Sequence, residues 1–407
     1  MRIAQVSPLF ERVPPPLYGG TERIVSYLTE ELVRQGHDVT LFASGDSVTR
    51  ARLVAPCPEA LWRSGCELHD AYHQILLDRV MAMRHEFDVI HFHFDYWHLA
   101  LARRCGIPYV TTLHGRLDLP DLVPLYRTFP ETPVVSISDA QRAPLPWLNW
   151  QHTVYHGLPE DAFGLNEHPQ DYLAFIGRAS PEKGLEEAIA IALGAEVPLR
   201  IAAAVQPVNR DYFDQVIRPK LNHPLVEYVG ELGGRDKEEL LANARALLFP
   251  IVWPEPFGVA MIEAMACGTP VVAYRRGSVP EVVQHGVTGF VVDGVEEAAS
   301  SIAGLDALDR RTVRAVFEER HSARRMASEY ADVYLRLSDS TEATPTQHDV
   351  VPGMAEERMT AVQRRRRDAR SMIFRRAQRA ADARGRGLPH AEVLAEVPSA
   401  AIGFEDP

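Results

Sequence analysis

Two glutamates in the segment 253–270 carry the clearest chemical potential in this sequence. Glu255 lies between two prolines, which exclude a helix there, and Glu263 lies in the apolar run that follows. That run predicts a buried helix, on which a carboxylate is costly unless a hydrogen bond satisfies it. Hydroxyl groups of one ligand lying across the start of the helix would satisfy both carboxylates. A neighbouring arginine is the alternative partner for Glu263.

The start of this predicted helix also suits an anion. The N–H groups of a first helical turn have no partner within the helix, and the helix dipole favours negative charge there. Here those groups belong to Phe257, Gly258 and Val259. The segment therefore predicts a ligand that carries both hydroxyl groups and negative charge.

Two cations lie beside another predicted helix start. Arg178 and Lys183 flank the turn between a strand at 172–176 and a helix that runs to about Leu193. Arginine can bind a diphosphate through two hydrogen bonds and lysine can act as a point charge. Such a pair would stabilise a leaving diphosphate without a metal ion. Most isolated lysines and arginines are simply solvated, which is the alternative interpretation.

Glycine and histidine residues mark the corresponding places in the first half. Gly19 and Gly20 join a strand at 3–7 to a helix that opens at Thr21, so the backbone there could approach an anion closely, although a simple tight turn is the alternative. Two strands, at 89–92 and 109–112, end in polar residues. These residues are His91, His93, Asp95, His114, Arg116 and Asp118.

The elements that position these residues alternate between strands and helices. Further strands are predicted at 151–158 and 246–249, and further helices at about 96–104, about 210–221 and 310–337. This alternation predicts parallel sheets, with the ligand crevice at the carboxyl ends of the strands. The imidazoles of His91 and His93 would share one face of a strand, and Asp95 could join them around a metal ion. Because no fourth ligand is evident, we expect the three residues either to bind a ligand directly or simply to line the crevice, and we expect no bound metal. For His114 a structural hydrogen bond to backbone is the alternative to a catalytic contact.

Composition narrows the class of protein. The 407 residues are 46% hydrophobic and 24% charged, which predicts a globular protein with two domains. The net charge of −12 argues against nucleic-acid binding by the body of the protein. The four cysteines lack C-x-x-C spacing, and neither a membrane-spanning run nor a signal peptide is evident. We therefore expect a cytoplasmic protein.

Three segments together resemble a known family. EPFGVAMIE followed by AMACGTPVVA, the string YGGTERIVSYLTEELVRQGHDVTLFASG, and GRASPEKG are similar to motifs of the family-4 retaining glycosyltransferases of the GT-B fold, or glycosyl transferases group 1. The resemblance extends from residue 1 to about residue 337. It implies an α/β protein in which two Rossmann-like parallel-sheet domains face a central cleft, with a C-terminal crossover helix and an extra tail.

The resemblance also implies domain limits. Residues 1–165 would form the acceptor domain and residues 166–308 the nucleotide-sugar domain. Residues 309–337 would form the crossover helix back to the first domain, and residues 338–407 would form a linker and an arginine-rich tail.

The family pattern assigns roles to the residues above. The donor-binding set is Gly19, Gly20, Arg178, Lys183, Leu232, Phe257, Gly258, Val259 and Glu263. Within it, Arg178 and Lys183 would hold the diphosphate and Glu263 the ribose hydroxyls. The catalytic set is His114, near the anomeric side of the transferred sugar, and Glu255, on its hydroxyls. His91, His93, Asp95, Arg116 and Asp118 remain acceptor-side candidates.

The implied activity is transfer of a sugar from a nucleotide-diphosphate sugar to an acceptor hydroxyl with retention of configuration. The family needs no essential metal or other cofactor, and its retention is explained without an enzyme nucleophile. The acceptor could be a glycan, a lipid or a small molecule. A nucleotide-sugar epimerase of the same architecture and a non-catalytic nucleotide-sugar-binding protein are the alternatives.

The tail lies outside the resemblance. Residues 355–385 predict a helix with arginines on several faces and little apolar area. A helix exposed to solvent is one interpretation. Blocks of like charge are also often interaction tails, so binding to a partner is possible as well. Docking at the inner face of an anionic membrane and contact with a protein or a nucleic acid are the others.

Overall fold

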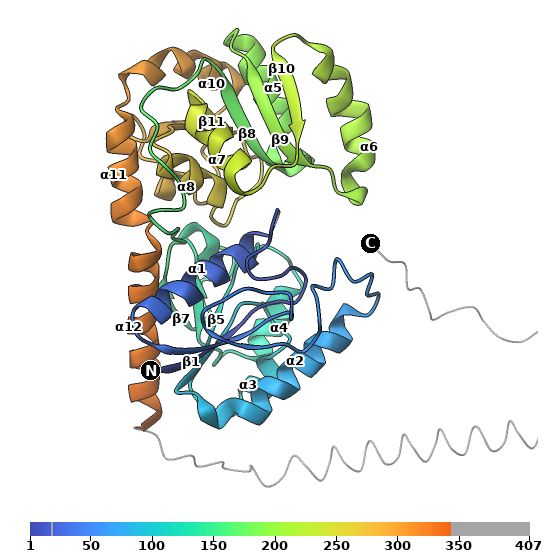
Figure 1. The fold of residues 1–407 in the computed structure, drawn as a ribbon, viewed down its shortest axis with the longest axis vertical. Helices are drawn as coiled ribbons and strands as arrows, with labels where there is room; N and C mark the ends of the chain where they lie inside the picture. Colours follow the sequence, from blue (N-terminus) through green and yellow to red (C-terminus); the bar gives the residue numbers. More distant parts are fainter. Residues whose placement is uncertain (18, 343–407) are drawn as a thin grey trace, which may run out of the picture. The chain divides into compact units, whose positions relative to one another are not determined.

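The computed structural model describes residues 1–17 and 19–342, which form two parallel sheets with helices packed on them. We call the first sheet with its helices the first lobe and the second sheet with its helices the second lobe. Figure 1 shows both lobes, with many of their helices and strands labelled. The lobes meet through hydrogen bonds: Ser138 Oγ donates to the Pro256 carbonyl oxygen at 2.6 Å, and the N–H groups of Asp139 and Ala140 donate to Glu281 at 2.7 Å.

The first sheet has seven strands in the order β3-β2-β1-β4-β5-β6-β7. These strands are largely buried because helices cover the sheet, as in parallel sheets generally. The strands are β1 Arg2–Val6, β2 Asp38–Phe42, β3 Arg52–Val54, β4 Val89–Phe92, β5 Tyr109–Thr112, β6 Val134–Ser136 and β7 Trp150–Thr153. The helices are α1 Gly20–Arg34, α2 His69–Met83, α3 Leu99–Ala102 and α4 Leu122–Thr128, with short 3-10 turns η1 Arg84–Glu86 and η2 Ala140–Arg142.

The second sheet has six strands in the order β10-β9-β8-β11-β12-β13. They are β8 Leu173–Arg178, β9 Leu199–Ala204, β10 Val226–Gly230, β11 Ala246–Phe249, β12 Val271–Tyr274 and β13 Gly289–Val292. The helices are α5 Leu185–Gly194, α6 Arg210–Tyr212, α7 Gly234–Asn243, α8 Val259–Ala266, α9 Val279–Val282, α10 Val295–Ser301, α11 Arg310–Arg320 and α12 Ala323–Glu342. Short turns are the 3-10 segments η3 Pro181–Lys183, η4 Pro207–Asn209, η6 Arg218–Asn222 and η7 Ile302–Ala307, and the π-helical η5 Phe213–Ile217.

Both sheets reverse their strand order at one point, between β1 and β4 in the first and between β8 and β11 in the second. In open parallel sheets the crevice outside the carboxyl ends at such a point is the usual ligand site. The loop that follows β1 leads to the glycine pair, and β8 ends at Arg178. The topology therefore brings these two predicted anion-binding segments to the same kind of position in each lobe.

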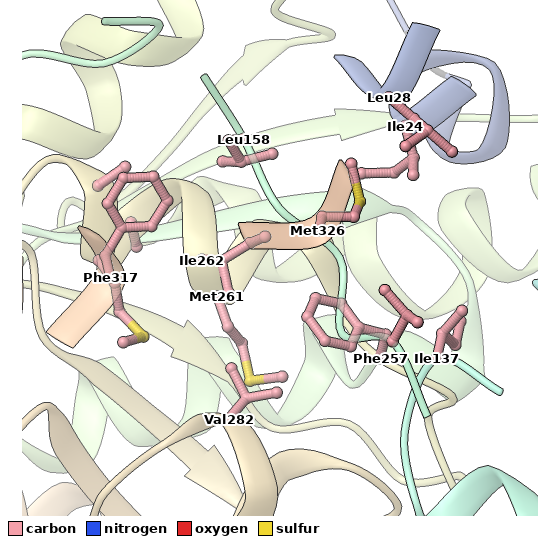
Figure 2. Close-up of a cluster of buried hydrophobic side chains, with 14 of the residues drawn as sticks. Ile24, Leu28, Ile137, Leu158, Phe257, Met261, Ile262, Val282, Phe317 and Met326 are labelled. Carbon is pink, nitrogen blue, oxygen red and sulfur yellow. The ribbon is translucent and has the colours of Figure 1, made fainter. Parts of the chain in front are cut away.

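A continuous apolar core ties the lobes together. Figure 2 shows its side chains, with Ile24 and Leu28 from α1, Ile262 from α8 and Met326 from α12 in one cluster. The helix α11 packs on α8 of the second lobe. The helix that follows it in the chain, α12, packs on α1, β4 and β5 of the first lobe. Residues near the C-terminal end of the described chain therefore stabilise the N-terminal sheet.

The crossover segment corrects one prediction. We predicted a single helix from residue 310 to 337, but α11 ends at Arg320 and α12 begins at Ala323. The chain breaks because it pairs with Leu158 between them. The Leu158 N–H donates to the His321 carbonyl oxygen at 2.9 Å, and the Ala323 N–H donates to the Leu158 carbonyl oxygen at 2.8 Å. These bonds use backbone groups that a continuous helix would need for itself.

The helix also continues beyond its predicted end. Residues 338–342 belong to α12, so a linker that begins at residue 338 is wrong at its start. The arginine-rich segment of the predicted tail, residues 355–385, lies outside the described residues. The other predicted boundary, near residue 165, falls in the connection between β7 and β8.

Smaller differences follow from local sequence. Only Leu99–Ala102 of the helix predicted at about 96–104 is α-helical, and the strand predicted at 151–158 is reduced to β7. The helix predicted at about 210–221 is interrupted by π and 3-10 turns, and Pro219 lacks the N–H that a regular helix would use. The short elements β3 and α4 were not predicted. Within residues 1–17 and 19–342, none of the helices combines the length and apolar character that crossing a membrane requires.

Candidate active site

A cavity of about 330 Å³ opens between the lobes at the carboxyl ends of both sheets, and we call it the central cavity. Residues from the first half of the chain line one side and residues from the second half line the other. The predicted residues that line it are Gly19, Gly20, His114, Arg116, Arg178, Lys183, Leu232, Glu255, Phe257, Gly258, Val259 and Glu263. Every predicted donor-binding residue and both predicted catalytic residues are therefore brought to one space.

Glycines allow two helix starts to open into this cavity from opposite lobes. Gly19 precedes α1 with φ of 140°, and a Cβ on it would lie 2.8 Å from Pro15. Gly258 precedes α8 with φ of 82°, and a Cβ on it would lie 2.7 Å from the methyl group of Met261. Larger residues are disfavoured at both positions by backbone conformation and by space. Because both helix starts border the cavity, their free N–H groups could bind an anion there.

Glu255 is held by two donors. Lys183 Nζ lies 2.6 Å from Glu255 Oε2, and Trp253 Nε1 donates to the same oxygen at 2.7 Å. The lysine ammonium also lies 5.1 Å from the Trp253 ring centre, within cation–π range. The side chains of Lys183 and Glu255 are 17% and 11% exposed, so bulk water screens this pair only weakly. The predicted cation and the predicted carboxylate therefore form one unit.

Glu263 has a cationic partner that sequence reasoning missed. Lys237, on α7, lies 2.5 Å from Glu263 Oε1, and the Glu263 side chain is only 4% exposed. The predicted need of this buried carboxylate for a partner is thus met within the chain by a lysine rather than an arginine. A signal existed in the sequence, because Lys237 follows β10 at a helix start much as Lys183 follows β8.

Arg178 is engaged within its own lobe. Its Nη2 donates to Glu182 Oε1 at 3.0 Å, and its Nη1 donates to Gln206 Oε1 at 3.4 Å. Each of the three cations at this wall, Arg178, Lys183 and Lys237, is therefore bonded to a carboxylate. A phosphate group could replace those carboxylates as the hydrogen-bond acceptor, since it offers the same kind of charged oxygen.

His114 is positioned by a buried chain of uncharged groups. Its Nε2 lies 3.0 Å from His93 Nδ1, and His93 Nε2 lies 2.7 Å from Gln5 Oε1. Because an amide oxygen only accepts, His93 carries its proton on Nε2 and accepts the proton of His114 Nε2–H at Nδ1. His114 Nδ1 is then a buried acceptor without a hydrogen-bond partner in the described structure. The chain of bonds leaves one lone pair of His114 for a ligand.

Burial keeps these imidazoles neutral. It lowers the pKa of His114 to about 3 and lowers that of His93 well below the ordinary histidine value. His156, which stacks on His114 at 5.3 Å, also has its pKa lowered by burial. At neutral pH the first lobe therefore presents polar but uncharged imidazoles to the central cavity.

The same chain continues under α12 and explains the position of His91. Gln5 Nε2 donates to the Tyr334 hydroxyl at 3.0 Å, and that hydroxyl lies 2.7 Å from His91 Nδ1. His91 Nε2 in turn lies 2.7 Å from Thr112 Oγ1, and His91 is fully buried. His91 was an acceptor-side candidate, but it lines neither the central cavity nor the second cavity described below. Its hydrogen bonds connect the sheet to the crossover helix.

The other acceptor-side candidates fall at different places. His93 and Asp95 line a second cavity beside the central one, where burial raises the pKa of Asp95 to about 6. Arg116 lines the central cavity and lies 5.4 Å from the Trp253 ring centre of the opposite lobe. It is also bonded to Asp118, with nitrogen–oxygen distances of 2.6 and 2.7 Å. Asp118 itself lines only a small hollow outside the central cavity.

The arrangement suits group transfer from a charged ligand. One wall offers three cations, Arg178, Lys183 and Lys237, which could bind phosphate groups. It also offers three carboxylates, those of Glu231, Glu255 and Glu263, which could bind hydroxyl groups. The opposite wall offers the neutral imidazole of His114, with a free lone pair, together with Arg23 and Arg116. A second cavity adjoins it for another reactant.

Two family models match this chain. Residues 18–153 match Glycosyltransferase Family 4, and residues 159–325 match Glycosyl transferases group 1. D-inositol 3-phosphate glycosyltransferase of Thermobispora bispora is 30% identical over 323 residues, which cover 65% of this chain and 73% of the relative. N-acetyl-alpha-D-glucosaminyl L-malate synthase of Bacillus anthracis is 26% identical over 369 residues, which cover 78% and 94%.

A solved structure is similar over both lobes. AviGT4, a glycosyltransferase involved in avilamycin A biosynthesis, superposes with a TM-score of 0.64 at 26% identity. The superposition covers 83% of this chain and 98% of AviGT4.

Proposed function

We propose that this chain, a glycosyltransferase of the GT-B fold that belongs to the glycosyl transferases group 1 family, takes its sugar from a nucleotide-diphosphate sugar. The acceptor is a hydroxyl group of a second molecule, and the anomeric configuration is retained. The observation that carries this proposal is the convergence of Lys183–Glu255, Lys237–Glu263 and Arg178 on one cavity that His114 faces from the other lobe.

Donor binding would use the charged wall. The diphosphate would take hydrogen bonds from Arg178 and Lys183 and from the N–H groups at the start of α8. Lys183 and Glu255 would separate, which frees the glutamate to accept from hydroxyl groups of the transferred sugar. Glu263, oriented by Lys237, would accept from the ribose hydroxyl groups. Each carboxylate would thus keep a donor when the ligand arrives.

The chemical step would be direct displacement on the face of the leaving group. The acceptor oxygen forms a bond to the anomeric carbon, and the bond between that carbon and the β-phosphate oxygen breaks. The acceptor proton passes to the departing phosphate oxygen, whose remaining charge Arg178 and Lys183 stabilise. His114 Nδ1 would accept a hydrogen bond from a hydroxyl group of the sugar and so orient it. Neither glutamate serves as a nucleophile in this scheme.

The cations of the chain would make a metal ion unnecessary. Arg178, Lys183 and the N–H groups at the start of α8 would offset the charge of the leaving diphosphate, which is the usual task of Mg²⁺ in phosphate chemistry. Activity in the presence of a chelator should therefore equal activity with added Mg²⁺. A large loss of turnover with the chelator that Mg²⁺ restores would contradict this part of the proposal.

The donor assignment is tested by calorimetry with UDP, GDP and ADP sugars on the wild-type protein and on Glu263→Ala. We expect one of the donors to bind and Glu263→Ala to weaken it by about tenfold, the value of one good hydrogen bond to a charged group. Glu227→Ala removes a glutamate of an exposed pair in the same lobe and is the matched control. Equal affinity in the wild type and Glu263→Ala would contradict the ribose role.

Product analysis with labelled donor tests the reaction class. A glycoside whose anomeric configuration matches the donor is expected when an acceptor is present. Release of a free epimer of the sugar would instead indicate an epimerase. Tight donor binding without turnover over a broad acceptor panel would indicate a binding protein.

A further inference from the structure

The second cavity, of about 330 Å³, adjoins the central cavity in the first lobe, and we call it the aromatic cavity. Gly19, Gly20, Thr21, His114 and Gly115 line both. A molecule in the aromatic cavity would therefore lie beside the histidine that faces the donor. The shared residues place a second reactant within reach of the first.

Aromatic side chains form a wall of this cavity. Phe10 stacks on Trp62 with ring centres 5.3 Å apart and contacts Trp97 at 5.9 Å, and Phe94 contacts Trp97 at 5.7 Å. Trp62 is 51% exposed, which leaves a large apolar ring facing water at the mouth of a cavity. An exposed aromatic surface of this kind is typical of a binding site for a ligand with an apolar face.

Two carboxylates lie where the aromatic cavity meets the central one. A Cβ on Gly19 would lie 3.4 Å from Glu22 Oε2, and one on Gly115 would lie 3.6 Å from Asp95 Oδ2. Glu22 is only 5% exposed. Burial raises the pKa of Glu22 to about 7 and that of Asp95 to about 6. Both groups accept hydrogen bonds in their charged form. Backbone N–H groups of Glu11 and Glu22 already donate to Glu22, and hydroxyl or N–H groups of a ligand would supply further donors.

Positive charge is missing from the part of this lining that the structure describes, which contains neither lysine nor arginine. Two nearby cations are engaged with other acids, Arg63 with Glu11 at 3.5 Å and Arg116 with Asp118 at 2.6 Å. A third, Arg23, donates to the backbone carbonyl oxygens of Pro15 and Leu17. A phosphate or carboxylate group in the aromatic cavity would lose water and would meet Glu22 and Asp95 in a medium that screens charge weakly. The cavity therefore opposes anionic ligands.

We propose that the aromatic cavity binds the acceptor and selects an uncharged ring compound, with one apolar face for the aromatic wall and hydrogen-bond donors at its edge. Unphosphorylated sugars, cyclitols and comparable ring alcohols belong to this class. Their phosphate esters are excluded by the absence of a cation in the described lining and by the two acids. This inference rests on the proposed function, because it names the second substrate of the same transfer.

The experiment compares matched pairs of probes that differ only by a phosphate group, glucose with glucose 6-phosphate and inositol with inositol 3-phosphate. Binding is followed by quenching of tryptophan fluorescence, with and without saturating UDP, on the full chain. We expect the neutral member of at least one pair to bind at least about tenfold more tightly than its phosphate ester. The proposal would be overturned if neither neutral probe bound more tightly than its phosphate ester. It would also be overturned if none of the four probes bound.

Variants locate the binding. Trp62→Ala should reduce the affinity of the neutral probe by about tenfold, the scale of a stacking contact in a pocket, while leaving affinity for the nucleotide donor unchanged. Trp147→Ala is the matched control, since Trp147 is also exposed, at 42%, but lines neither cavity. Equal loss in both variants, or no loss in Trp62→Ala, would contradict the assignment.

A charge variant tests the second half of the proposal. Asp95→Asn removes one of the two acids without changing the shape of the side chain, and we expect it to narrow the preference for the neutral probe by severalfold. An unchanged preference would mean that the carboxylates do not select against anions. Because donor binding is measured separately by calorimetry, loss of donor binding would refute the proposed function, whereas normal donor binding with a preference for phosphate esters would refute only this inference.

Discussion

Two groups of polar side chains on opposite walls of the central cavity are held by different means. In the second lobe, Lys183–Glu255 and Lys237–Glu263 are charged pairs at 2.6 and 2.5 Å. In the first lobe, His114, His93 and Gln5 form a chain of uncharged hydrogen bonds. Both arrangements satisfy groups that would otherwise be costly to bury.

The difference matches what each wall must do. A lysine paired with a carboxylate can exchange that carboxylate for a phosphate group, so Lys183, held by Glu255, is ready to bind a diphosphate. A neutral chain cannot supply charge, but the direction of each hydrogen bond fixes the direction of the next. We infer that the second lobe is built to bind a charged donor and the first to orient groups at the reacting carbon.

Removal of a cation from the charged wall should have the largest effect. Lys183→Ala removes one of the two cations that would stabilise the leaving diphosphate. Of the two donors to Glu255 among the described residues, it leaves the indole of Trp253. We expect kcat/KM to fall by about 100- to 1000-fold, as for loss of one donor to a developing negative charge. Steady-state kinetics with saturating acceptor measure it.

Lys220→Ala is the control for this change, because Lys220 pairs with Glu186 in the same lobe and lies outside the central cavity. A similar loss of kcat/KM in both variants would indicate a general effect of charge. Turnover in Lys183→Ala close to the wild-type value would break the proposed distinction between the two walls.

Loss of the neutral His114 should affect turnover rather than donor binding. His114→Ala removes the lone pair that would orient the sugar, and we expect kcat to fall by about 100-fold while donor affinity changes by less than about threefold. Calorimetry and steady-state kinetics on the same variant separate the two quantities. A loss confined to donor affinity would place His114 with the charged wall instead.

Gln5→Met should have a smaller effect of the same kind. It leaves the buried volume similar but removes the oxygen that fixes the proton on His93 Nε2, so the proton of His114 is no longer confined to Nε2. We expect kcat to fall by about tenfold, equivalent to about 1.4 kcal/mol. Nitrogen chemical shifts of the imidazoles should show mixed tautomers in the variant and one tautomer in the wild type. Normal tautomers with reduced kcat would indicate a packing defect instead.

The pH dependence of stability should be the smallest effect. Burial and repulsion from Glu11 raise the pKa of Glu22 to about 7, from an ordinary value of 4.5. Between those pH values the folded protein binds more protons than the unfolded chain, so the free energy of unfolding contributed by Glu22 falls as pH rises. Glu22→Gln should therefore melt about 3 °C above the wild type at pH 8 and close to it at pH 4.5.

Calorimetric melting curves at the two pH values measure this effect, with Glu227→Gln as an exposed control. A Glu22→Gln variant that gains as much stability at pH 4.5 as at pH 8 would show that the gain is unrelated to ionisation. His114 should add nothing to the pH dependence of turnover between pH 5 and 8, because its pKa is held at about 3.

Much of the fold could be predicted because its signals are local. Strands β4, β5 and β11 were predicted with their observed bounds, since each is a short apolar run between polar or turn residues. The GT-B fold and the glycosyltransferase activity, predicted from three motifs, are confirmed by the matched family models and by AviGT4. The break at residues 321–322 could not be predicted, because the bonds that cause it come from Leu158.

The sequence by itself determined the kinds of groups at the site. Local patterns specify these groups. Prolines keep Glu255 outside the helix, and an apolar run predicts that the carboxylate of Glu263 is buried. A glycine at each helix start predicts an open turn that could bind an anion. Such patterns act through backbone conformation and burial, which neighbouring residues largely fix. They do not indicate which distant residue forms the hydrogen bond or ion pair with each group.

Only the tertiary structure decided the partners. Lys237 reaches Glu263, Gln5 and His93 orient His114, and His91 turns away to Tyr334 under α12, from positions far apart in the chain. Hydrogen bonds and ion pairs depend on distances of about 3 Å, and those distances arise when sheets, helices and lobes pack. His91 and His93 are two residues apart in the chain but have different surroundings. His93 lines the aromatic cavity, whereas His91 lies in the core.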